Sequence, residues 1–115
     1  MIKKKLSYLN GSVLIDNLLL AESSIERMRG LLGRPQFDND SALIIPQCNS
    51  VHTLFMKYTI DVVYLNKKGV ILKIVRSLKP WRFSGCLKAF YTLEMLAENS
   101  LHKELSIGQT LSWLD

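Results

Sequence analysis

The stretch from Ile60 to Val75, IDVVYLNKKGVILKIV, decides the fold class. Residues 60–65 and 70–75 are rich in valine and isoleucine, whose β-branched side chains favour strands. The four residues between them end in Gly69, and hairpin connections use glycine where the backbone must turn left-handed. We therefore expect a β-hairpin at the centre of the chain.

Short strands are also expected on both sides of this hairpin. The expected segments are 11–20 with a turn or bulge at Asp16 and Asn17, 42–45, 89–96 and 110–114. Residues 78–85 are expected to form a loop. Many short strands with few helices predict a mainly β fold, either a small single-domain β-barrel or a sandwich.

Two helices are expected beside the strands. The first, in the N-terminal half at about 24–32, is opened by Ser23 and Glu26, which have capping-box spacing, and it is ended by Gly33 and Pro35. The second is a short C-terminal helix at about 100–105, where Leu101 and Leu105 can be buried together.

Length and composition indicate one soluble domain spanning residues 1–115. Of these residues, 48% are hydrophobic and 22% are charged, which is ordinary for a globular protein. No apolar run approaches the ~18 residues of a membrane span. No signal-peptide core follows the basic start at 1–5, so we expect a cytoplasmic protein whose two cysteines are thiols.

The net charge of +5 is unevenly distributed. No acidic residue lies between Asp61 and Glu94, and the interval 67–88 holds a basic stripe. The stripe consists of Lys67, Lys68, Lys73, Arg76, Lys79, Arg82 and Lys88. Such a stripe can attract nucleic acid, an acidic protein face or anionic lipid, although a solvated surface is the simpler interpretation. No recognition helix, zinc-finger spacing or RNA-binding motif accompanies it, so we do not expect a nucleic-acid partner.

The segment 48–56, CNSVHTLFM, concentrates reactive side chains. Cys48, His52 and Met56 stand four residues apart, and their side chains suit nucleophilic chemistry or soft metals. Residues 50–57 are expected to be largely extended, which would place such positions about 13 Å apart on one face. That separation excludes a metal site made by this segment alone, unless the chain bends near Cys48. We expect neither a metal nor another cofactor.

Four blocks of the chain together resemble one family. They are RMRGLLGR at 27–34, CNSVHTLFM at 48–56, IDVVYL at 60–65 and KPWR at 79–82. In this order they are similar to the domain-of-unknown-function 192 family, also called uncharacterised protein family 0127. The resemblance extends from Val13 to Leu111 and implies a compact, mostly-β bacterial or archaeal domain without an established reaction. It also implies that relatives are often exported or membrane-anchored.

One pairing would explain two of these blocks without any function. Arg27 or Arg29 can pair with Asp61 and so tie the first helix to the sheet by a charge-assisted hydrogen bond. A strand-start aspartate is otherwise hard to justify.

The favoured function is a non-catalytic module that binds a small ligand or a protein segment. The candidate binding site consists of His52, Cys48, Met56, Lys79, Trp81 and Arg82. A proline-bearing loop with aromatic and basic residues is typical of recognition surfaces. Two alternatives stay open: an enzyme or redox protein using Cys48 with His52 or Cys86, and weak nucleic-acid binding through the stripe at 67–88. The sequence predicts no oligomeric state.

Overall fold

The computed structural model describes residues 2–21, 23, 40–97 and 105–113, and this part of the chain is mainly β. Its nine strands are β1 Ile2–Tyr8, β2 Val13–Leu20, β3 Ser41–Pro46, β4 Ser50–His52, β5 Ile60–Leu65, β6 Ile71–Leu78, β7 Phe83–Gly85, β8 Tyr91–Leu96 and β9 Leu111–Ser112. Among these residues there is no helix long and apolar enough to cross a membrane.

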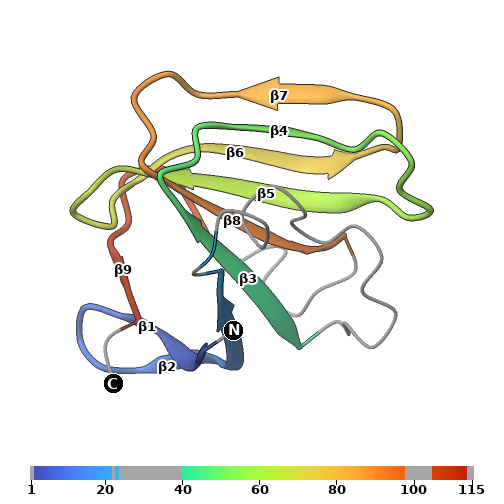
Figure 1. Ribbon diagram of the computed structural model, residues 1–115. Helices are drawn as coiled ribbons and strands as arrows, with labels where there is room; N and C mark the ends of the chain where they lie inside the picture. The colour runs from blue at the N-terminus through green and yellow to red at the C-terminus, as the bar shows by residue number, and fades with distance from the viewer. Residues whose placement is uncertain (1, 22, 24–39, 98–104, 114–115) are drawn as a thin grey trace.

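Seven of the strands form one sheet in the order β6-β5-β8-β3-β2-β1-β9. β2 and β3 run parallel, and the other neighbours run antiparallel. The two outer strands meet at one corner, where Val70 and Thr110 form a bridge and the Leu111 N–H donates to the Gly69 carbonyl at 2.8 Å. The sheet therefore curves into a single half-barrel. The segments just before β6 and β9 meet at the left of Figure 1.

The remaining strands, β4 and β7, pair into a small antiparallel sheet that lies over one face of the half-barrel (Figure 1). Side chains alternate along the strands of the large sheet, so each of its faces carries one hydrophobic cluster. The cluster beneath the small sheet includes Leu43, Ile45, Val62, Tyr64 and Met56, with Val51, Cys48 and Cys86 packed against it. The cluster on the opposite face includes Leu6, Leu18, Ile44, Val63 and Leu93.

The predicted central hairpin is confirmed. β5 and β6 pair antiparallel, and Gly69 in the connection has a φ of 84°. The Asn66 Oδ1 atom accepts hydrogen bonds from the Lys68 and Val70 N–H groups at 2.9 and 3.0 Å. A Cβ atom at Gly69 would collide with the Leu111 carbonyl oxygen. Glycine is therefore required here by the backbone angle and by the close approach of β9.

The pairing of the large sheet shifts register at four places, two between β1 and β2 and two between β5 and β6. Asp16 and Asn17 stand opposite one residue of β1, as the sequence led us to expect. In β6, two residues oppose Asp61, because Ile60 pairs with Leu78 and Val62 with Val75. Ser77 in this bulge has a φ of 57°, and its N–H donates to the Asp61 Oδ1 atom at 2.8 Å. Asp61 thus has a local structural task as a hydrogen-bond acceptor for the bulge.

The sequence-based expectations miss two strands. β1 was not expected, because three consecutive lysines hide its alternation, and β7 lies inside the expected loop 78–85. The strand expected at 60–65 is present with those ends, and the strands expected at 42–45, 70–75, 89–96 and 110–114 are present with shifted ends. The helix expected at 24–32 and residues 100–104 of the second helix lie outside the described residues.

Candidate functional site

Thr53 joins the two segments that were expected to form the site. Its hydroxyl donates to the Lys79 carbonyl at 2.6 Å and accepts the Arg82 N–H at 2.9 Å. Its backbone N–H donates to the Arg82 carbonyl, and its own carbonyl accepts the Trp81 N–H, both at 2.9 Å. Thr53 is completely buried, so water does not compete for these groups. The loop from Lys79 to Arg82 is therefore held firmly at the end of β4.

The chain turns directly after Thr53, so the expectation of an extended segment at 50–57 is wrong beyond His52. Leu54 and Phe55 form a turn, Phe55 has a φ of 67°, and the Met56 N–H donates back to the Thr53 carbonyl at 3.2 Å. The turn places Phe55 in solvent and buries Met56 in the cluster beneath the small sheet. Met56 is therefore a core residue and leaves the candidate site.

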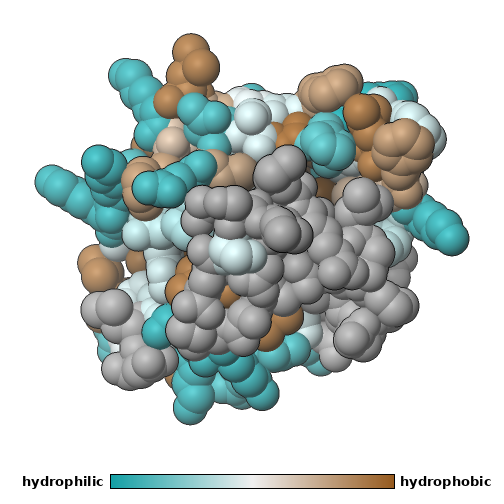
Figure 2. All heavy atoms as spheres, in the orientation of Figure 1, coloured by the Kyte–Doolittle hydropathy of each residue, from teal (hydrophilic) through white to brown (hydrophobic). Residues whose placement is uncertain are grey.

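Large aromatic side chains surround this turn, and we call Phe55, Trp81, Phe83 and His52 the aromatic platform. Phe55 is 67% exposed, Trp81 55% and Phe83 74%. The Phe55 and Trp81 ring centres lie 4.8 Å apart, and those of His52 and Phe83, which face each other across β4 and β7, lie 6.4 Å apart. In Figure 2 hydrophobic residues lie among hydrophilic ones at the upper right, the corner where β4 ends and β7 begins in Figure 1.

Positive charge borders the platform. Lys79 and Arg82 are exposed on the same loop as Trp81, and Lys57 is exposed just beyond the turn. The nearest acidic residues along these segments, Asp61 and Glu94, are buried in the large sheet. The platform therefore offers apolar rings beside cationic groups, a combination that suits negatively charged partners.

The two cysteines are not part of the exposed platform. Both are free thiols, both are half-buried, and both pack against the cluster beneath the small sheet. The Cys48 thiol donates to the Ser50 carbonyl at 3.2 Å, and the Cys86 N–H donates to the Asn49 carbonyl at 2.8 Å. His52, by contrast, is exposed beside Phe83. Cys48 and Met56 therefore both belong to the cluster beneath the small sheet, whereas His52 lies outside it on the surface.

The buried phenol of Tyr64 belongs to the cluster that both cysteines pack against, which the sequence did not indicate. The Tyr64 hydroxyl donates to the Ser84 Oγ atom at 3.0 Å. Burial raises the pKa of Tyr64 above its usual value, the hydrogen bond to Ser84 lowers it in part, and neighbouring Cys48, Glu94 and Cys86 raise it further. Tyr64 is therefore a protonated hydrogen-bond donor that ties β5 to the small sheet.

Two other expectations concern the same region. Arg27 and Arg29 lie outside the described residues, so their pairing with Asp61 stays a prediction. Within residues 2–21, 23, 40–97 and 105–113, no three His, Cys, Asp or Glu side chains group closely enough to hold a metal ion.

Sequence reasoning chose His52, Lys79, Trp81 and Arg82, which do lie together around β4 and β7, but it missed Thr53, Phe55 and Phe83. The exposure of Phe55 results from the turn after Thr53. An alternating strand at these positions did not predict it.

Comparisons with known proteins agree on a family and a fold. The family model DUF192, described as "Uncharacterized ACR, COG1430", matches residues 9–113. A "UPF0127 protein" of Thermococcus sibiricus is 30% identical over 110 residues, covering 90% of this chain and 70% of that protein.

Two crystal structures share the fold at low sequence identity. A "putative transcription regulator" of Sinorhizobium meliloti 1021 superposes with a TM-score of 0.80 at 19% identity, covering 97% of this chain and 94% of the other. A protein of unknown function from Novosphingobium aromaticivorans gives a TM-score of 0.75 at 16% identity, covering 97% and 84%.

Proposed function

We propose that this chain, which belongs to the DUF192 family of uncharacterised proteins, is a non-catalytic module. Its partner is a protein segment that carries both acidic and apolar side chains. The observation that carries the proposal is the aromatic platform. Three of its large rings are more than half exposed on one corner of the molecule. Exposed apolar surface of this kind marks interaction sites in soluble proteins.

The platform is held in shape before any partner arrives. Trp81 and Phe55 both have left-handed backbone angles, with φ values of 64° and 67°. Non-glycine residues in this region cost of order 1–3 kcal/mol each and concentrate at functional sites. The buried Thr53 hydrogen bonds hold both turns in place. A rigid aromatic surface loses little conformational entropy on binding, which favours affinity.

The charge beside the rings selects the kind of partner. Lys79 and Arg82 offer cationic groups at the rim of the platform, and Trp81 between them is the type of residue that dominates binding energies. Charge complementarity then favours a segment bearing aspartate or glutamate next to apolar side chains. The enzymatic alternative uses Cys48 with His52 or with Cys86. Cys48 packs against the cluster beneath the small sheet whereas His52 is exposed, which gives the pairing of Cys48 with His52 no support.

The test begins with a random linear peptide library displayed on phage and selected against the whole protein. We expect the enriched peptides to combine acidic and apolar residues. They should bind the Trp81→Ala variant at least about tenfold more weakly than the wild type, which is the loss expected when a central interface residue is removed. The matched control is Leu87→Ser, which removes a side chain that is 94% exposed at the far end of β7 and should leave binding unchanged.

Charge is tested with the same peptides. The double variant Lys79→Gln/Arg82→Gln should weaken binding several-fold, and the wild-type affinity should fall as salt is added. Failure of the library to enrich any peptide, or equal binding by Trp81→Ala and wild type, overturns the proposed function.

A further inference from the structure

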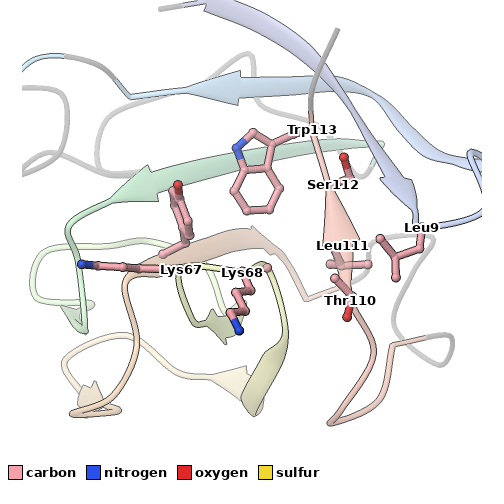
Figure 3. A pocket seen from close by; sticks show the side chains of 9 residues that line it. Leu9, Lys67, Lys68, Thr110, Leu111, Ser112 and Trp113 are labelled. Carbon is pink, nitrogen blue, oxygen red and sulfur yellow. The ribbon is translucent and has the colours of Figure 1, made fainter.

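A pocket of about 260 Å³ opens at the corner where the two ends of the half-barrel meet. It is lined by the hairpin turn 67–69, the segment 110–113, Leu9 and Tyr91. Figure 3 shows the Trp113 ring above and the Lys67 and Lys68 side chains below it. The eight residues of β6 separate this corner from the aromatic platform, a distance of roughly 25 Å. The pocket is thus a second candidate site, independent of the proposed function.

Aromatic rings build one wall of the pocket. The Tyr91 and Trp113 rings meet edge to face with their centres 4.7 Å apart, and Phe90 meets Tyr91 in the same way at 4.8 Å. The Lys67 ammonium group lies 5.3 Å from the centre of the Phe90 ring. These contacts fix the wall and the lysine beside it, so the pocket is formed without a ligand.

Four polar side chains of the pocket have no hydrogen-bond partner among the described residues. Within the part of the chain that the structure describes, the hydroxyls of Tyr91, Thr110 and Ser112 and the indole N–H of Trp113 make no hydrogen bond to the protein. Lys67 and Lys68 are exposed at its edge, and none of the described residues that line it is acidic. The pocket therefore combines an aromatic wall, available donors and two positive charges.

We propose that this pocket binds a small organic carboxylate whose body is one aromatic ring or a fused pair. The volume lies just below the ~300–1,000 Å³ of pockets that take drug-sized molecules, which limits the ligand to that size. The ring packs against Trp113 and Tyr91, and the carboxylate accepts hydrogen bonds from Lys67, Lys68 or the nearby hydroxyls. Charge-assisted bonds of this kind are stronger than neutral ones.

The probe is indole-3-acetate, titrated into the nitrogen-15-labelled full chain while the indole N–H signals of Trp113 and Trp81 are followed by NMR. Trp81→Phe assigns the two signals. We expect a saturable shift of the Trp113 signal with a dissociation constant on the order of 1 mM or tighter, and no shift at Trp81. Tryptophol, the neutral analogue in which an alcohol replaces the carboxylate, should bind several-fold more weakly.

Two variants locate the carboxylate. The double variant Lys67→Gln/Lys68→Gln should weaken the binding of indole-3-acetate about five- to tenfold, because exposed charged hydrogen bonds contribute modestly. It should leave the binding of tryptophol unchanged. Ser112→Ala, which keeps both lysine charges, should weaken the binding of indole-3-acetate about threefold. The matched control Lys79→Gln lies at the other end of β6 and should change nothing. An unmoved Trp113 signal, equal binding of the two probes, or an equal loss in Lys79→Gln overturns the proposal.

Discussion

At Thr53 a single side chain holds two turns that carry exposed aromatic rings. Its partners are the backbone groups of Lys79 and Arg82, 26 and 29 residues further along the chain. No pattern within the segment 48–56 could predict these partners, because they depend on how β4 and β7 pair. The sequence drew attention to Cys48 and His52 for their chemistry, whereas the residue that organises the site is chemically plain.

Replacing Thr53 by valine keeps its shape and removes its hydroxyl. We expect Thr53→Val to lower the free energy of unfolding by about 1–3 kcal/mol, because the Arg82 N–H loses a buried acceptor. Urea unfolding measures the loss. Thr59→Val is the control, since the Thr59 hydroxyl makes no hydrogen bond to the described residues, and an equal effect of the two changes would contradict this role.

The raised pKa of Tyr64 makes stability depend on alkaline pH. Above about pH 10 an unfolded tyrosine releases its proton while folded Tyr64 keeps it, so the folded state binds more protons and stability falls as pH rises towards the folded pKa. Tyr64→Phe should cost about 1 kcal/mol at neutral pH through the lost bond to Ser84. Its deficit should then shrink above pH 10 in urea titrations. A deficit that stays constant with pH would refute the assignment.

Among the elements, the β5–β6 hairpin was predictable because its information is local. Valine and isoleucine set the strands, and the turn needs only Asn66 and Gly69. β7 was not predictable, because three residues after a proline-bearing loop carry no pattern of their own and pair only through β4. The parallel pairing of β2 with β3 likewise has no signature in either strand.

The hairpin turn also closes the corner against β9. We expect Gly69→Ala to destabilise the protein by more than the ~1–3 kcal/mol of a left-handed non-glycine residue, because its Cβ also meets the Leu111 carbonyl. Gly108→Ala isolates the backbone cost, since Gly108 has a φ of 96° and nothing lies within 4 Å of its added Cβ. Thermal melting compares the two, and equal losses would show that the contact with β9 is unimportant.

The bulge in β6 allows the charge of Asp61 to be tested separately from its hydrogen bond. Asp61→Asn keeps an acceptor for the Ser77 N–H and removes the charge. If Arg27 or Arg29 pairs with Asp61, this substitution should lower the free energy of unfolding by about 3–5 kcal/mol, because it breaks a buried ion pair. The neutral Arg27→Gln or Arg29→Gln should then remove most of that cost in the double variant. An unchanged melt of Asp61→Asn would dismiss the ion pair.

At the scale of the whole molecule, two surfaces lie at opposite ends of β6. The aromatic platform stands at the end of β6 that leads to Lys79, and the pocket beside Trp113, seen in Figure 3, stands at the other. The basic stripe predicted from the sequence supplies charge to both, because Lys67 and Lys68 border the pocket while Lys79 and Arg82 border the platform. Composition predicted a basic surface, but only the fold divides it between two sites.

The position of a bound peptide tests the central claim most directly. The backbone amide signals of the nitrogen-15-labelled protein are recorded while a peptide selected from the phage library is added. The proposed function predicts shifts concentrated at residues 52–56 and 79–83, which Trp81→Ala abolishes and Leu87→Ser preserves. Shifts concentrated elsewhere, such as at 67–69 and 110–113, or shifts that persist in Trp81→Ala, would contradict it.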